Sequence, residues 1–365
     1  MRSLALAALA VLLGAGCSRR PQQPALARAT EYLWSHQSPD GGWPSHTYGL
    51  LRSGQSLTPF VLEALLRVPD QPIDKIDRAV EFIRRNTNSD GALGMMDPTL
   101  PDYPNYATAL AVSALCRAKR PGWEQHIAPM IAYLRRMQFT ESTGWKQSDP
   151  PYGAWGMGGI DHPPPNPGHV DLSMTRYVLD ALQAARIPAQ DMAFTRARIF
   201  VERCQNFDPQ HPDDADGGFF FSTTEVDTNK AGQVGGHFRS YGTTTADGIL
   251  ALLAVGRPLD DVRVRAAQRW LTSHHKDMAV PGFIGEAYQR WPKGLAFYYA
   301  AASTQAFRAL QVPLSPTVAN ALRQSQRADG SWSNPENLVK EDDPFIATGF
   351  AVRALALSDS KTASY

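Results

Sequence analysis

The feature of this sequence that most restricts its fold is a loop of the form Gln-x3-Gly-x-Trp, which occurs twice. The first copy runs from Gln37 to Trp43 and the second from Gln326 to Trp332. Each copy follows an amphipathic stretch and precedes a second, more apolar one. Because a fixed motif between two helix-like segments marks an internal repeat, we expect the chain to be built from repeated helix pairs.

Weaker copies of this arrangement lie between the two. They are found at residues 90–93, 138–145, 205–219 and 281–283. Each again separates an amphipathic stretch from an apolar one, so the sequence contains six helix pairs.

The two helices of each predicted pair differ in composition. The first carries many Arg, Glu and Gln side chains, with apolar residues at helical spacing such as Ala79, Phe82 and Ile83. The second is rich in Ala and Leu, as in residues 346–357, and should be buried on most sides. Charged helices outside and apolar helices inside predict an all-α fold, an (α/α)6 barrel over residues 25–360. An open superhelix of HEAT or TPR type is the alternative, but those repeats have a steadier period and lack the Gln-Gly-Trp loop.

Charge and cysteine content exclude several functions. The chain has 36 Lys and Arg against 35 Asp and Glu, so it lacks the basic surplus that nucleic-acid binding needs. Its three cysteines are too few for a disulfide framework, and Cys116 and Cys204 lie in helical patterns as expected of buried free thiols. Neither a Gly-rich phosphate loop nor a Gly-x-Ser-x-Gly motif is present, so we expect no cofactor.

The first residues have the pattern of an export signal. A positive start at Arg2, an apolar run over residues 4–13 and small residues up to Gly16 predict a signal peptide over residues 1–16. Residues 14–17 resemble a bacterial lipobox, with Gly14 where that motif prefers Leu. This resemblance implies lipidation at Cys17 and a polar tether over residues 17–24. We expect a lipid-anchored protein of the bacterial cell envelope, on the outer membrane if the cell is Gram-negative; ordinary secretion is the alternative.

The Gln-x3-Gly-x-Trp loops resemble the QW repeat of squalene and hopene cyclases. The six-pair layout of residues 25–360 resembles the prenyltransferase/squalene-cyclase-repeat superfamily, and four shorter segments are similar to a bacterial group within it: residues 152–156, 171–175, 239–242 and 297–299. The resemblance implies a toroid that acts on, or binds, an isoprenoid or other apolar ligand in its central cavity. In the loops, Gln is expected to hydrogen-bond the start of a neighbouring helix and Trp to pack beneath it.

The same resemblance singles out the segment from His169 to Thr175. Squalene–hopene cyclases protonate an alkene with the middle aspartate of an Asp-x-Asp-Asp-Thr motif. Asp171 matches that aspartate, while His169 and Leu172 replace the other two. A protonated His169 would lower the pKa of Asp171 and make it a stronger acid. The alternative is a buried Asp–His or Asp–Arg pair that holds the barrel together.

Other candidate site residues stand at the starts of the apolar helices, which gather at one mouth of such a barrel. Arg239 and Tyr241 join Asp171 and His169 as candidate catalytic residues, Arg239 because a guanidinium grips a carboxylate or phosphate. A salt bridge from Arg239 to Asp171 or Asp247 is the alternative. The candidate ligand-binding residues are Asn105, Tyr106, Tyr298, Tyr299 and Asp343. Tyrosine rings stabilise cations, whereas an aspartate before a helix also serves as a simple cap.

Three functions remain open from the sequence. The first is a cyclase-like isoprenoid enzyme; the others are a non-catalytic envelope binding module and an extracellular polysaccharide lyase or hydrolase on the same fold. Protein prenyltransferase β-subunits hold zinc with Asp, Cys and His, but their Asp-x-Cys pairing is missing here, so no metal is expected. The sequence leaves a protein partner undetermined.

Overall fold

The computed structural model describes residues 23–360 except 98, 209, 211–214 and 226. The predicted signal peptide over residues 1–16, the lipidation of Cys17 and most of the tether lie outside the described residues.

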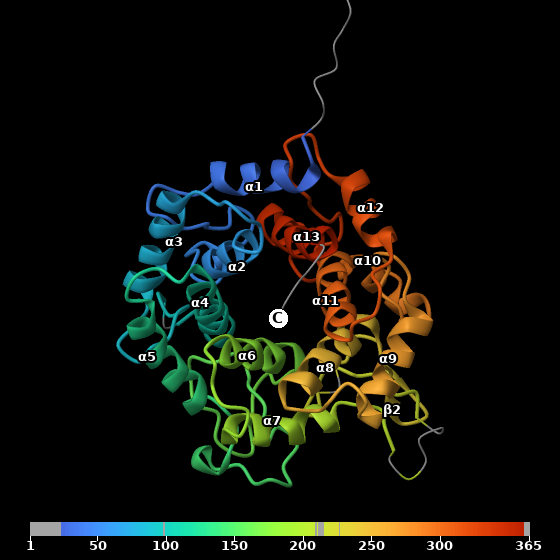
Figure 1. Ribbon diagram of the computed structural model, residues 1–365. Coiled ribbons are helices and arrows are strands. Elements are labelled where there is room, and N and C mark those ends of the chain that lie inside the picture. Colours follow the sequence, from blue (N-terminus) through green and yellow to red (C-terminus); the bar gives the residue numbers. More distant parts are fainter. Residues whose placement is uncertain (1–22, 98, 209, 211–214, 226, 361–365) are drawn as a thin grey trace, which may run out of the picture.

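Twelve helices form two concentric rings around a central axis (Figure 1). The inner ring consists of α2 (Leu57–Leu65), α4 (Pro104–Ala118), α6 (Leu172–Ala184), α8 (Gly242–Ala254), α11 (Ala296–Ala309) and α13 (Pro344–Asp359). The outer ring consists of α1 (Ala25–Ser35), α3 (Ile73–Asn86), α5 (Trp123–Arg136), α7 (Met192–Arg203), α9 (Val262–His274) and α12 (Pro316–Ser325). Helix α13 packs against α2 and closes the inner ring. The predicted (α/α)6 barrel is therefore confirmed.

Shorter elements connect the rings. They are the 3-10 helices η1 (Gly49–Leu51), η2 (Glu141–Thr143) and η3 (Glu286–Tyr288), the one-turn helix α10 (Trp291–Gly294), and the antiparallel strands β1 (Gln233–Val234) and β2 (His237–Phe238). The two strands lie in the long connection between α7 and α8.

Burial follows the two predicted helix types. Every residue of α2 is buried, including Glu63, because this helix is packed on all sides. In α3 only one face is buried, formed by Ile76, Ala79, Phe82 and Ile83. A helix that is apolar all round belongs to the interior, and one with a single apolar stripe belongs to the periphery. The apolar pattern of each helix therefore predicted whether it lies in the inner or the outer ring.

The glutamine of each Gln-Gly loop joins neighbouring repeats. Gln37 Nε2 donates to the Gly41 carbonyl within its own loop at 3.0 Å and to the Lys75 carbonyl in the first turn of α3 at 2.9 Å. The side chains of Gln138, Gln205 and Gln326 make the same two bonds. For Gln326 the second acceptor is Ala25 at the start of α1, so this contact links the last repeat to the first.

The tryptophans of these loops are structural. The indole N–H groups of Trp43 and Trp332 donate to the carbonyls of Leu33 and Leu322 in the preceding outer helices, and both rings are at most 1 % exposed. In the third repeat the equivalent residue is Trp155, which bonds the Leu134 carbonyl. The weaker copy predicted over residues 138–145 ends at Trp145 and so put that residue in this position. The prediction was wrong, because an intervening segment separates Gln138 from the indole of Trp155 that packs under the helix.

A threonine near the start of the inner helix completes the unit, and the motif search missed it. In five repeats its hydroxyl accepts the backbone N–H of the loop residue at the tryptophan position, 2.9–3.2 Å away. These residues are Thr58, Thr108, Thr175, Thr245 and Thr348. The bond ties each loop to its own inner helix.

Two further expectations concern the cysteines and the lengths of the helices. Cys116 and Cys204 are buried free thiols, as predicted. Of the helices that the structure describes, none is both long and apolar enough to cross a membrane.

Candidate functional site

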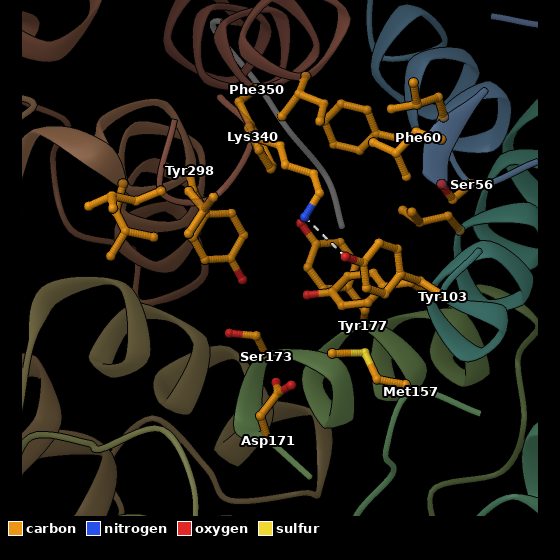
Figure 2. Close-up of a pocket in the computed structure, with 18 of the residues that line it drawn as sticks. Ser56, Phe60, Tyr103, Met157, Asp171, Ser173, Tyr177, Tyr298, Lys340 and Phe350 are labelled. Atoms are coloured by element: carbon orange, nitrogen blue, oxygen red, sulfur yellow. Dashed lines mark hydrogen bonds between the residues drawn. The ribbon is translucent and has the colours of Figure 1, made fainter. Parts of the chain in front are cut away.

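A cavity of about 360 Å³ opens at the N-terminal ends of the inner helices (Figure 2). Its walls are mainly aromatic and aliphatic, which suits an apolar ligand. The aromatic lining consists of Phe60, Tyr103, Tyr106, Tyr177, Phe221, Tyr298 and Phe350. The polar lining consists of Ser56, His169, Asp171, Ser173, Lys230 and Lys340.

Two chain segments build the polar wall. The segment before α6 runs beside the connection that follows α7, where the Leu172 N–H donates to the Phe221 carbonyl at 2.9 Å. The Ser222 hydroxyl donates to the Val170 carbonyl at 2.6 Å. These bonds bring residues 169–173 and 221–230 to the same side of the cavity.

Asp171 is the N-cap of α6, and its carboxyl points toward the cavity (Figure 2). Its Oδ1 accepts the Met174 N–H at 2.7 Å, and its Oδ2 lies 2.9 Å from His169 Nε2. His169 Nδ1 in turn lies 3.2 Å from Glu225 Oε2. A carboxylate at each ring nitrogen requires a donor at both, so this geometry selects the imidazolium form of His169.

The electrostatics of this triad agree with its geometry. Burial by itself lowers the His169 pKa, but the hydrogen bond and charge of Asp171, with the charge of Glu225, outweigh it. The net effect is a raised His169 pKa. Asp171 is almost fully buried, whereas the Glu225 side chain is 32 % exposed. The three residues therefore form a hydrogen-bonded path from the protein surface to the cavity wall.

A second carboxyl lies behind the wall. Asp247 of α8 is fully buried, and its Oδ2 accepts the hydroxyls of Ser173 and Tyr298, each at 2.6 Å. Burial raises its pKa to about 6, although Arg176, Ser173 and Tyr298 act in the opposite direction. This residue fixes the orientation of two cavity-lining hydroxyls.

Two lysines also line the cavity, and sequence reasoning missed both because they lie in loops without a motif. Lys230 Nζ is 3.3 Å from the centroid of the Phe221 ring. Lys340 Nζ donates to the Tyr103 hydroxyl at 3.1 Å and reaches into the opening (Figure 2). Burial lowers the pKa of Lys230 to about 8, against the opposing charges of Asp171 and Glu225.

Charged side chains lie beneath the aromatic walls. The Arg353 guanidinium is 4.5 Å from the Phe60 ring centroid and 2.9 Å from Glu63 Oε2. Burial by itself raises the Glu63 pKa, but Arg353, Arg67 and Arg117 together hold it far below its usual range. This buried charge cluster supports the aromatic rings from behind.

Four of the candidate residues meet at this cavity. His169, Asp171, Tyr106 and Tyr298 all line it, as expected for residues at the starts of inner helices. The rings of Tyr106 and Tyr177 lie 4.9 Å apart, and the ring of Tyr298 meets that of Phe350 at 5.2 Å.

Other candidate residues face elsewhere. Arg239 lines a separate groove near the β1–β2 hairpin, while Asp171 pairs with His169 and Asp247 with Arg176. Tyr241 is the N-cap residue of α8 and packs against Phe283. The placement of Arg239 and Tyr241 in the cavity was wrong, because the connection before α8 turns them away from the axis.

The remaining three candidates have structural contacts. Asn105 donates to the Gly156 carbonyl at 2.8 Å, and the Tyr299 hydroxyl lies 2.8 Å from His275 Nδ1 near the outer ring. Asp343 caps α13 by accepting the Phe345 N–H, so the capping alternative holds. Successive helical residues point about 100° apart, which is why Tyr106 and Tyr298 reach the cavity and their neighbours do not.

Within the described ranges, no group of three or more His, Cys, Asp or Glu side chains is arranged to hold a metal ion.

Known proteins resemble this chain in structure but not in sequence. No protein-family model matches it, and no curated protein matches it. The type II terpene cyclase MstE from Scytonema superimposes with a TM-score of 0.56 at 13% identity, covering 91% of this chain and 96% of that one. A protein from Actinoplanes gives 0.56 at 17% identity over 92% and 99%, and a D-mannose isomerase gives 0.54 at 12% over 90% and 96%.

These likenesses define the fold class. The chain has the α/α toroid architecture found in type II terpene cyclases and also in a sugar isomerase. One fold serves different chemistries, so the function has to be argued from the cavity.

Proposed function

We propose that the central cavity binds an isoprenoid and that Asp171 protonates it to start a cyclisation. The observation that carries this proposal is the position of Asp171: an acid hydrogen-bonded to His169, at the wall of a cavity lined by aromatic rings. The proposal extends the resemblance of residues 169–175 to the acidic motif of squalene–hopene cyclases.

The proposed reaction begins with proton transfer. The His169 imidazolium first passes its Nε2 proton to the Asp171 carboxylate. Asp171, now the neutral acid, gives a proton to one carbon of a terminal alkene, and the π electrons form the new C–H bond. The more substituted carbon becomes a cation, which internal alkenes attack in turn. Loss of a proton from the carbon beside the last cation regenerates an alkene, so the product is an isomer of the substrate.

The neighbouring groups support this role. The His169 imidazolium stabilises the carboxylate that Asp171 leaves behind and supplies the next proton. Glu225 keeps His169 cationic and connects it to solvent. The rings of Tyr106, Tyr177 and Tyr298 offer their π faces to a carbocation, each worth roughly 0.5–2 kcal/mol.

The size of the cavity favours a single isoprenoid chain. About 360 Å³ lies at the lower end of the range for small-molecule pockets, which is roughly 300–1,000 Å³. The Scytonema cyclase has been solved with geranylgeranyl dihydroxybenzoate as its substrate and with merosterolic acid A as its product. By this analogy we propose a ligand with a linear polyprenyl chain.

The proposal includes a location for the protein, the cell envelope. The apolar run and lipobox-like residues before Ser18 support export and attachment at Cys17 to the cell envelope. An enzyme held there would meet its apolar substrate at the membrane surface.

The test is incubation of the protein with farnesyl, geranylgeranyl and squalene substrates, followed by mass spectrometry of the extracted lipids. We expect an isomer of unchanged mass that disappears in Asp171→Asn. Asparagine still accepts the Met174 N–H, because Asn and Asp are equally good N-caps, so the variant should fold. The matched control is Asp261→Asn, which makes the same change at the N-cap of the outer helix α9.

Each other result identifies a different function. Isoprenoid recovered intact in a stable complex would replace the cyclase with a binding module. Failure to bind any isoprenoid, with new reducing ends or unsaturation produced from envelope polysaccharides, would identify a glycan-degrading enzyme.

A further inference from the structure

We infer that Lys230 is a nucleophilic amine that captures an apolar aldehyde as an imine within the central cavity. This activity goes beyond the proposed cyclisation, since it needs neither an alkene nor proton transfer from Asp171 to carbon.

The surroundings of Lys230 are those of a reactive lysine. Its Nζ lies over the Phe221 ring at 3.3 Å from the centroid and 5.9 Å from that of Trp291. Its hydrogen bond to the Thr228 carbonyl is long, at 3.5 Å. Lys340, the other cavity lysine, instead donates to the Tyr103 hydroxyl at 3.1 Å. When its nitrogen reacts, Lys230 gives up this long hydrogen bond and the contact of its ammonium with the Phe221 ring, whereas Lys340 would give up a shorter hydrogen bond.

The residue before Lys230, Asn229, is held by four hydrogen bonds. The side chain of Asn229 accepts the N–H groups of Phe221 and Ser222 and donates to the carbonyls of Ser222 and Glu225, all within 2.8–3.0 Å. Asn229 itself is 4 % exposed. The lysine is therefore held against the cavity wall by four hydrogen bonds at the residue before it, and little ordering remains for the reaction to supply.

Burial also makes the amine nucleophilic. The charged groups near it are Asp171, Glu225 and the His169 imidazolium between them. The carboxylates favour the ammonium form, but loss of hydration prevails and brings the pKa to about 8. At pH 7.5 about a quarter of such amines are neutral, against about 0.1% for an ordinary lysine, and the neutral amine is the nucleophile.

The neighbouring acid and base complete the chemistry. The nitrogen lone pair attacks the carbonyl carbon, the C–O π bond breaks, and one amine proton moves to the oxygen, which gives a carbinolamine. Asp171, whose carboxyl faces the cavity, passes the Nε2 proton of the His169 imidazolium to that hydroxyl, which leaves as water as the C=N bond forms. The second nitrogen proton returns by way of Asp171 to His169, which yields the neutral imine. Aldehyde and amine thus give imine and water, with no oxidant or reductant needed.

The walls of the cavity set the class of aldehyde. Lys230 belongs to the polar lining of a cavity whose apolar lining includes Phe60, Phe350 and Leu110. A long apolar aldehyde, such as a polyprenyl aldehyde, places its carbonyl at Lys230 and its chain against these side chains. A small or highly charged aldehyde gains nothing from the same walls.

Reductive trapping tests the inference in the intact protein. The probe is farnesal, a 15-carbon apolar aldehyde, added with sodium cyanoborohydride, and the modified lysines are located by peptide mass spectrometry. We expect one dominant adduct on Lys230, with a labelling rate that is half-maximal near pH 8. Prior addition of the matching alcohol, farnesol, should suppress it. The label should be lost in Lys230→Arg and kept in Lys340→Arg, the matched change at the other cavity lysine.

Labelling spread over surface lysines in proportion to their exposure, or labelling that follows Lys340, would overturn the inference. Absence of any adduct would overturn it as well. Peptide mapping of the labelled wild-type protein decides among these outcomes even if a variant fails to fold. Because the label is read without turnover, its result is independent of whether the protein cyclises an isoprenoid.

Discussion

The acidity of His169 provides a direct test of the proposed proton path. Its Nδ1 lies 3.2 Å from Glu225 Oε2. Even at the dielectric constant of bulk water, two unit charges at that separation attract by about 1.3 kcal/mol, which corresponds to about one pKa unit. Glu225→Gln removes the charge but leaves an oxygen that still accepts from Nδ1–H. We therefore expect the His169 pKa to fall by about one unit.

The assay is an NMR titration of the histidine ring protons, with the His169 signal assigned by a His169→Gln variant. In the wild type the signal should titrate above 6.5, because Asp171 and Glu225 raise the pKa. His275 is an internal control: burial lowers its pKa, and its ring contacts Tyr299, so Glu225→Gln should not move it. A wild-type His169 that titrates at or below 6.5, or a shift under about 0.3 unit in the variant, would refute the reasoning.

Two further predictions concern the fold and its response to pH. Gln326→Ala removes both hydrogen bonds to Ala25 and Gly330, so urea unfolding should show a loss of about 2–3 kcal/mol. Gln125→Ala on the exposed face of α5 should change the unfolding free energy by less than about 0.5 kcal/mol. Equal losses in the two variants would show that the two hydrogen bonds of Gln326 contribute nothing to stability. The Asp247 pKa is raised from 3.8 to about 6, so its neutral form contributes stability below pH 3.8 that is lost as the pH rises through 6. Relative to Asp247→Asn, the wild type should lose on the order of 3 kcal/mol between pH 4 and pH 7.5, and parallel curves for the two proteins would contradict the burial argument.

The fold was accessible from the sequence because its signals are local and repeated. In four repeats the glutamine of the loop bonds a helix start, and the paired helices differ in apolar pattern, so both the repeat and the two rings could be predicted. The threonine that accepts a backbone N–H in five repeats escaped notice, since a threonine in an apolar helix has several ordinary roles. Trp145 was predicted at the position that Trp155 occupies, because a prediction from residue spacing cannot account for an inserted segment.

The site was predicted only where helix geometry determines it. Asp171 and Tyr298 were identified because inner helices start at the mouth of the barrel. Tyr299 and Arg239 were misplaced because the side of a helix start or loop that faces the axis depends on packing between repeats. Lys230 comes from a loop that acquires its position through Asn229, and no sequence pattern reports that contact.

Deuterium incorporation from the solvent tests whether such a reaction begins with proton transfer from Asp171. If Asp171 starts a cyclisation, the product made in D2O gains one deuteron and later loses one proton.

The most direct measurement is therefore mass spectrometry of the lipids formed from a geranylgeranyl substrate in D2O. We expect a cyclised product one mass unit heavier than the substrate with the wild type, and unchanged substrate with Asp171→Asn. A product without deuterium, the same product from Asp171→Asn, or substrate recovered intact from the wild type would contradict the proposal.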